Sequence, residues 1–157
     1  MATPPPEPRI RDVAAADLPS LLELYHQLSQ GGEQPNELPE QPREHHQRAL
    51  RELTASPWYR LLVAEADGQI VGTYEICILP GIAHGARPRA IVENVVVDER
   101  YRSRGVGDAM MRDAVERARA AGCFRVGLTS HLRRADAHRF YERLGFRHTH
   151  RGYTWYL

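Results

Sequence analysis

A short segment in the second half of the chain combines arginines and glycines in a way that suits phosphate binding. It reads Arg102-Ser103-Arg104-Gly105-Val106-Gly107-Asp108. A guanidinium group can bind two phosphate oxygens at once, and a glycine, which has no Cβ, lets a bulky phosphate approach the backbone. A helix that begins here adds unpaired N–H groups and the positive end of its dipole. The segment therefore predicts a site for phosphate or pyrophosphate.

The surrounding sequence predicts a strand, a helix and a second strand. Residues 91–97 are mostly apolar and β-branched, and residues 123–129 form a second short strand pattern. Between them, apolar residues recur at helical spacing, and Gly122 stands where a left-handed helix cap is expected. Two strands joined by one helix form a right-handed βαβ unit, so they should be parallel. The apolar helix positions are Gly107, Met110, Met111, Ala114, Val115, Ala118 and Ala121.

Two well-known phosphate-binding loops do not fit these residues. The P-loop requires a lysine, and this chain has none. The dinucleotide fingerprint requires a small residue where Met110 stands. It also requires an acidic residue at the end of the next strand, where Leu128 and Thr129 stand.

Three motifs occur in a fixed order along the chain. The strand end Val95-Val96-Val97-Asp98 is followed by the pattern Arg102-x-x-Gly105-x-Gly107, and then by Phe140-Tyr141-Glu142-Arg143-Leu144-Gly145-Phe146. In this order they resemble the GNAT superfamily of acetyl-CoA-dependent N-acetyltransferases. The resemblance extends over roughly residues 8–157.

The resemblance implies an α/β (α+β) fold. Its mixed central sheet has six to seven strands, is flanked by about four helices, and contains splayed parallel fourth and fifth strands. We expect residues 1–157 to form one such domain, with residues 1–7 disordered.

The resemblance also implies how acetyl-CoA is held. The pantetheine arm would bind backbone groups of Val95, Val96 and Val97. The pyrophosphate would bind the glycine turn at Arg102, Ser103, Arg104, Gly105, Val106, Gly107 and Asp108. Many relatives place an asparagine in the bend after the fifth strand, and none stands here, which leaves that contact open.

Tyr141 matches the family tyrosine that can protonate the departing thiolate. The residue pattern alone favours a packing role, because Ala137, Phe140, Tyr141 and Leu144 form one apolar stripe of a helix. With the family motif in place, the catalytic role is favoured.

Glu93 has the position of a family carboxylate and is the predicted general base. An acid inside an apolar strand is unusual, which favours a functional role. Strict alternation places Glu93 on the same face as Val95 and Val97, with Asn94 on the opposite face. A chain of water molecules is the alternative path for the proton, and Glu75 and Tyr74 are weaker candidates.

Other side chains are candidates for contacts with substrates. Glu33, Glu37 and Glu40, in a loop over residues 30–41, could meet a cationic amine, although for each of them singly a solvated loop carboxylate is the more common case. Arginines near the start of the last helix are candidates for phosphate contacts, and histidines near it could line the site. These residues are Arg133, Arg134, Arg139, Arg143, His131 and His138.

The rest of the chain predicts further helices and strands. A hairpin is expected at Asp67-Gly68. We expect helices over 17–28 and 42–55, and strands over 9–14, 60–66, 69–79 and 148–157. His45 and His46 point to different faces of their helix and have no partners at metal-ligand spacing, so no metal site is predicted.

Composition excludes several classes of function. The 157 residues carry a formal net charge of +1, which gives no electrostatic footprint for nucleic acid or for an anionic membrane. No signal peptide or membrane span is evident, and the two cysteines, Cys77 and Cys123, are expected to be free thiols. We expect a cytoplasmic protein.

The predicted function is transfer of the acetyl group of acetyl-CoA to a primary amine of a small molecule, by direct attack of the neutral amine. Two alternatives remain: a non-catalytic domain that binds or senses acyl-CoA, and a protein or peptide N-acetyltransferase. A homodimer is also considered, with residues 148–157 as a strand that lines the acceptor pocket or pairs with a second subunit.

Overall fold

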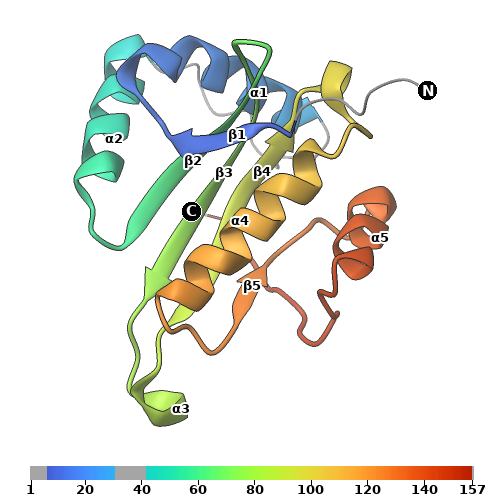
Figure 1. Cartoon of the computed structure of the whole chain (residues 1–157). Coiled ribbons are helices and arrows are strands. Elements are labelled where there is room, and N and C mark those ends of the chain that lie inside the picture. Colours follow the sequence, from blue (N-terminus) through green and yellow to red (C-terminus); the bar gives the residue numbers. More distant parts are fainter. Residues whose placement is uncertain (1–6, 31–41, 157) are drawn as a thin grey trace.

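The computed structural model of the chain describes residues 7–30 and 42–156 (Figure 1). In chain order the helices and strands are β1 (Arg9–Asp12), α1 (Leu18–Gln30), α2 (Arg43–Ala55), β2 (Tyr59–Ala66), β3 (Gln69–Leu79), α3 (Ala83–Ala86), β4 (Arg89–Val97), α4 (Val106–Ala120), β5 (Val126–Leu128) and α5 (Ala135–Arg143). The helices predicted over 17–28, 42–55 and 107–121 are confirmed as α1, α2 and α4.

The strands form one sheet in the order β1-β2-β3-β4-β5. The first four strands are antiparallel neighbours, and β4 and β5 are parallel, as the βαβ pattern predicts. The hairpin between β2 and β3 turns at Asp67 and Gly68, which both have left-handed backbones with φ of +52° and +72°. These angles match a two-residue turn that fits the twist of the strands.

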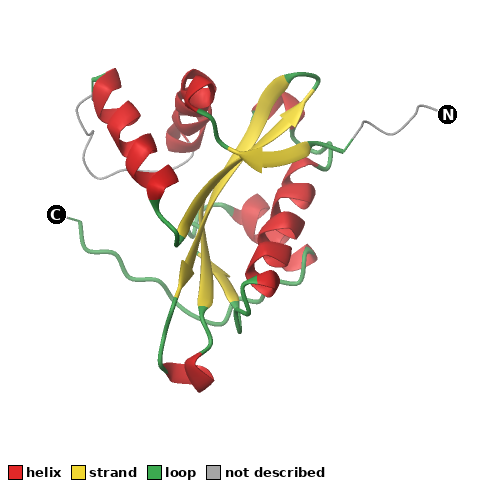
Figure 2. Cartoon of the chain, turned by 60° about the vertical axis from the view of Figure 1, so that its left-hand side comes forward, coloured by secondary structure: helices red, strands yellow, loops and turns green. Residues whose placement is uncertain are grey.

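Helices cover both faces of the sheet (Figure 2). On one face, Met110, Met111 and Ala114 of α4 pack on apolar residues of β2, β3 and β4. On the other face, α1 and α2 pack on β2 through Leu21 and Leu50. α5 lies beside β5 (Figure 1) and adds Phe140, Tyr141 and Leu144 to the core beneath α4.

The parallel pair β4 and β5 separates after three residues. Ala90, Ile91 and Val92 of β4 pair with Val126, Gly127 and Leu128 of β5. β4 then continues to Val97, whereas β5 ends at Leu128. The two strands therefore open like a V, which confirms the splayed pair predicted above.

The sheet has five strands in the described part of the chain, which is fewer than the six to seven expected. The strand predicted over 148–157 is absent between residues 148 and 156. Tyr153 and Trp155 in this segment are 92% and 90% exposed. Alternating aromatic residues favour a strand only when a neighbouring strand supplies hydrogen bonds and a surface to cover, and none of the strand pairs includes residues 148–156.

No helix within residues 7–30 and 42–156 combines the length and the apolar character that crossing a membrane requires. Cys77 and Cys123 are free thiols, as expected.

Candidate active site

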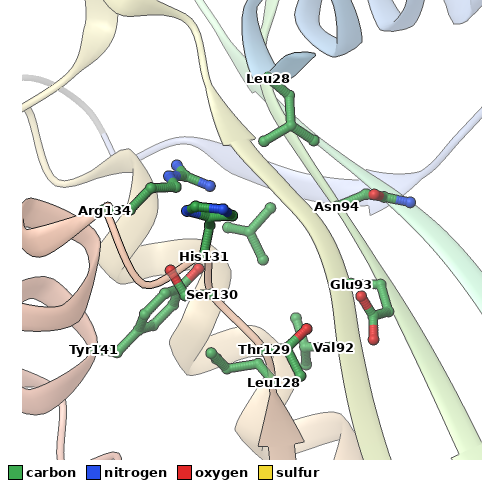
Figure 3. Close-up of a pocket in the computed structure, with 11 residues that line it drawn as sticks. Leu28, Val92, Glu93, Asn94, Leu128, Thr129, Ser130, His131, Arg134 and Tyr141 are labelled. Atoms are coloured by element: carbon green, nitrogen blue, oxygen red, sulfur yellow. The ribbon is translucent and has the colours of Figure 1, made fainter. Parts of the chain in front are cut away.

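A pocket of about 140 Å³ occupies the opening between β4 and β5 (Figure 3). Glu93 and Asn94 line it from β4, Ser130 and His131 from the loop after β5, and Tyr141 from α5. The helix α1 also reaches this pocket through Leu28. The V-shaped opening thus gathers side chains from distant parts of the chain, including both predicted catalytic residues.

β4 carries a β-bulge in its middle. Asn94 has a left-handed backbone with φ of +51°. Thr73 of β3 pairs with Val96 of β4, and Glu75 pairs with Glu93, so β4 has one residue more than β3 over this stretch. An extra residue in one strand reverses the alternation of its side chains beyond that point.

The bulge decides on which face Glu93 lies. Paired residues on neighbouring strands point to the same face of the sheet. Glu93 and Val96 pair with Glu75 and Thr73, so they lie on the face that α1 covers. Val95 and Val97 instead pack against the core beneath α4. The prediction that Glu93 shares a face with Val95 and Val97 is therefore wrong, because it counted the strand without its extra residue.

Glu93 lies directly opposite Glu75 in the strand register. Burial raises the pKa of Glu93 above its usual value, and the negative charge of Glu75 raises it further. A carboxylate with a raised pKa accepts a proton more readily, which suits a general base.

The two weaker candidates on β3 lie away from the pocket lining. Glu75 is 6% exposed and accepts hydrogen bonds from three side chains. Tyr74 is fully buried on the opposite face, beneath α4, where its hydroxyl donates to Asp113. Of the three carboxylate and phenol candidates on β3 and β4, Glu93 lines the pocket.

Tyr141 combines the two interpretations that the sequence allowed. Its ring packs edge-on against Phe140, with centroids 5.1 Å apart, and against Phe146 at 5.8 Å. The same residue lines the pocket. Burial raises the pKa of Tyr141 above its usual value, so the hydroxyl keeps its proton at neutral pH and is able to donate it.

The glycine turn leads directly into α4. Gly105 is the N-terminal cap of α4 and has φ of +82°, and Ser103 is also left-handed with φ of +60°. A Cβ added to Gly105 meets nothing within 4 Å, so the space beside it is open. The first N–H groups of α4, from Val106 onward, are unpaired within the helix and carry the positive end of its dipole.

Two arginines flank this turn. Arg102 donates from Nε to the carbonyl oxygen of Val97 at 3.2 Å, which joins the turn to the end of β4. The guanidinium group of Arg104 lies over the ring of Tyr101, 5.2 Å from its centroid. Both side chains are exposed, and each guanidinium group has further donors for a phosphate.

Gly107 packs closely against α5. A Cβ on Gly107 would lie 3.0 Å from Cζ and 3.2 Å from Cε2 of Phe140. Its missing side chain lets α4 and α5 approach each other closely, whereas the open space lies at Gly105.

Gly107→Ala is expected to lower the free energy of unfolding by about 1 kcal/mol. Overpacking against Phe140 costs about 1–3 kcal/mol, and the better helix propensity of alanine offsets part of it. Thermal or urea unfolding measures the change. Gly81→Ala is the control, because a Cβ there meets its nearest neighbour, Arg89, at 3.7 Å. A Gly107→Ala variant as stable as the parent would contradict the close packing.

Asp108 and Arg143 form an ion pair between α4 and α5, with N–O distances of 2.8 and 2.9 Å. The hydrogen bonds from Arg143 lower the pKa of Asp108 below its usual value. The charge of Asp108 is thereby compensated beside the predicted phosphate turn. Arg143, a candidate for phosphate contacts, has this carboxylate as its partner.

Residues 20–146 match the family model described as Acetyltransferase (GNAT) family. The chain belongs to the GNAT family. It is therefore a member of a family of acyltransferases, and the V-shaped opening and the glycine turn are to be interpreted in that context.

Two curated relatives align with part of this GNAT chain. A glucosamine 6-phosphate N-acetyltransferase of Trypanosoma brucei brucei is 40% identical over 83 residues, which are 53% of this chain and 54% of that protein. An aminoalkylphosphonate N-acetyltransferase of Salmonella typhimurium strain LT2 is 33% identical over 96 residues, 61% of this chain and 60% of that protein. The chain thus aligns with little more than half the length of these curated relatives.

Solved structures extend the similarity to nearly the whole chain. An acetyltransferase structure from Trypanosoma brucei shares 30% sequence identity and superposes with a TM-score of 0.78. The match covers 96% of this GNAT chain and 100% of that one.

The pocket of the GNAT chain contains an unused polar group. Ser130 Oγ is buried and has no hydrogen-bond partner among residues 7–30 and 42–156. It lines the pocket in the bend after β5. A buried hydroxyl without a partner is costly, and a polar group of a bound pantetheine arm would satisfy it. The site thus fits acetyl-CoA here and at the open glycine turn.

The remaining candidates divide into three groups. His131 and Arg134 line the pocket. His138 contacts the carbonyl oxygen of His131 through Nε2 at 3.0 Å, and Arg139 pairs with Asp136. Glu33, Glu37 and Glu40 lie outside the described residues.

The role of Asn94 in the bulge was not predicted from the sequence. Asparagine is depleted in strands and tolerates a left-handed backbone better than most residues. Its place inside a run of valines was therefore a usable signal for a bulge.

Proposed function

We propose that this chain is an N-acetyltransferase that moves the acetyl group of acetyl-CoA to a primary amine of a small molecule. The observation that carries the proposal is the pocket itself. It brings a half-buried, protonated Tyr141 and a carboxylate of raised pKa, Glu93, together in the opening between β4 and β5. Two titratable groups with opposite tasks in one pocket suit acid and base roles.

The residues of the chain have separate tasks in this reaction. Acetyl-CoA, when bound, supplies an acetyl group activated as a thioester. The first-turn amides of α4 and the two flanking arginines hold its pyrophosphate, and backbone groups of β4 near Val95 orient its arm. Glu93 takes a proton from the ammonium form of the acceptor, and Tyr141 donates a proton to the departing sulfur.

We propose that the acceptor carries an anionic group besides its amine. His131 and Arg134 line the same pocket as Glu93, so a cationic and an anionic group can be recognised together. Two of the relatives are named for amine substrates that also bear phosphate or phosphonate, which supports this class of acceptor.

The test is release of free thiol from acetyl-CoA across a panel of amines. The panel contains hexosamine phosphates, aminoalkylphosphonates, polyamines, aminoglycosides, amino acids and peptides. Turnover of a phosphate- or phosphonate-bearing amine supports the proposal. Turnover restricted to peptides indicates a protein acetyltransferase. No thiol release with any amine, together with confirmed acetyl-CoA binding, favours a non-catalytic acyl-CoA-binding domain.

The pH dependence of kcat/KM for the acceptor tests Glu93 as the base. A base must be unprotonated, so activity falls as pH falls through its pKa. Because the pKa of Glu93 is raised, this limb should lie above the ordinary glutamate value of about 4.3. Tyr59 and Glu75 face Glu93 from β2 and β3, and His131, Arg134 and Tyr141 face it across the pocket.

Glu93→Gln should remove this limb and lower kcat/KM about tenfold, less than a full general-base effect, because water can carry part of the proton flux. If the acidic limb of the pH profile is unchanged in Glu93→Gln, a chain of water molecules removes the proton instead. His131→Gln is the matched variant, which tests whether a histidine is the source of this limb.

A further inference from the structure

A buried carboxylate on β3 joins three parts of the fold. Glu75 accepts hydrogen bonds from the hydroxyl of Tyr25 on α1 at 2.6 Å, from the hydroxyl of Tyr59 on β2, and from Nδ2 of Asn94 in the β4 bulge at 2.8 Å. We call Glu75, Tyr25, Tyr59 and Asn94 the Glu75 cluster.

The chemistry of this cluster differs from that of an ordinary ion pair. All three donors are neutral, and no ion pair within the described ranges reaches Glu75. A buried carboxylate is costly unless it is hydrogen-bonded. Burial, together with the nearby charge of Glu75, raises the pKa of Tyr25 and of Tyr59, so both hydroxyls remain protonated donors.

Two of the donors belong to segments that form the wall of the pocket. Asn94 lines the pocket itself, and Leu28, one helical turn after Tyr25, lines it from α1. Glu93 precedes Asn94 and pairs with Glu75 in the strand register. The cluster therefore lies directly behind the side of the pocket that carries the predicted base.

The hydrogen bond to Asn94 also acts on the backbone. A left-handed conformation is disfavoured for residues other than glycine, and it persists where the surroundings hold it. The hydrogen bond from Nδ2 to Glu75 supplies such a restraint for the φ of +51°. The bulge in turn decides that Glu93 faces α1 rather than α4.

We propose that Glu75 is a positioning residue for the acceptor amine: its carboxylate holds α1 and the Asn94 bulge in one geometry, and so places Glu93 in the pocket. This inference rests on the proposed function. Glu75 does not itself contact substrate, because it is 6% exposed and three donors already occupy its two oxygens.

Glu75→Gln tests the proposal with steady-state kinetics. It keeps the shape of the side chain but replaces an acceptor oxygen with a donor that cannot receive all three hydrogen bonds. We expect KM for the amine to rise about tenfold or more. The Kd of acetyl-CoA, measured by calorimetry, should rise less than KM for the amine. The backbone near Val95, which is proposed to orient the pantetheine arm, adjoins the bulge, but the pyrophosphate turn lies beyond it.

Asn94→Gly keeps the left-handed backbone accessible and removes the amide, so it should raise KM for the amine in the same direction. It also keeps the test decisive if Glu75→Gln does not fold. Tyr74→Phe is the matched control. It removes a tyrosine-to-carboxylate hydrogen bond from the opposite face of the same strand, and should lower stability while leaving both substrates unaffected.

Two results would overturn the proposal. The first is an unchanged KM for the amine in both variants with a lower melting temperature, which would assign the cluster a purely stabilising role. The second is a loss of acetyl-CoA affinity as large as the rise of KM for the amine, which would mean that the Glu75 cluster supports acetyl-CoA binding rather than acceptor binding.

A readout that needs no activity separates this inference from the proposed function. In the parent protein the Nδ2 proton of Asn94 that donates to Glu75 should exchange with solvent more slowly by NMR than the second proton on the same nitrogen, and in Glu75→Gln this difference should disappear. Equal exchange of the two protons in the parent overturns the cluster even if amines are acetylated. Slower exchange of the donated proton without turnover of any amine supports the cluster and counts against the proposed function alone.

Discussion

Gly105→Glu is expected to weaken acetyl-CoA binding about 100-fold or more. The substitution brings a negative charge to the cap of α4, where unpaired amides and two arginines are predicted to hold a pyrophosphate. The new side chain has room, because a Cβ on Gly105 meets nothing within 4 Å. It would therefore occupy the space that the phosphate needs. Isothermal titration calorimetry with acetyl-CoA and with CoA measures the effect.

A matched control lies in the β2–β3 hairpin. Gly68 is also left-handed, with φ of +72°, and a Cβ there also meets nothing within 4 Å. Gly68→Glu therefore introduces the same charge and a similar backbone strain of about 1–2 kcal/mol at a distant turn. It should lose similar stability and keep full acetyl-CoA affinity. If Gly105→Glu binds acetyl-CoA as tightly as the parent protein does, the turn at Gly105 does not bind the phosphate.

Tyr141→Phe is expected to lower kcat about 10²-fold, the lower end of general acid effects. Phenylalanine keeps the ring contacts with Phe140 and Phe146, so the fall in kcat reports the contribution of the hydroxyl group alone. KM for the amine and the affinity for acetyl-CoA should change little, since the hydroxyl acts when the sulfur departs. Steady-state kinetics with the best acceptor of the panel measures the effect.

Tyr74→Phe separates the loss of an acid from the loss of a buried hydroxyl. Tyr74 is fully buried, and its hydroxyl donates to Asp113 on the α4 side. Its replacement should lower the melting temperature and leave kcat intact. If Tyr141→Phe retains the kcat of the parent protein, the acid role is excluded and Tyr141 is a packing residue.

Local patterns were sufficient for most of the secondary structure. The spacing of Met110, Met111 and Ala114 predicts α4, and the structure buries these side chains on the sheet. Gly122 was predicted as a left-handed helix cap, and its φ value is +72°. These features depend on residues within one or two helical turns, so a single sequence can show them.

Contacts between distant segments were not predictable in this way. One extra residue at Asn94 reverses the faces beyond it, and a periodicity of two carries no sign of it. The place of Phe140 beside Gly107 depends on how α5 docks against α4. Likewise, the predicted strand over 148–157 required a partner strand, which a local pattern cannot supply.

By itself, the sequence determined the order of helices and strands, the glycine turn before α4, and the GNAT family motif around Tyr141. Only the tertiary structure decided that Glu93 faces α1, that Ser130 lines the pocket, and that Glu75 holds Tyr25 and Asn94. The physical reason is distance along the chain. Backbone conformation responds to near neighbours, whereas Tyr25 and Glu75 are 50 residues apart and meet only when α1 packs on the sheet.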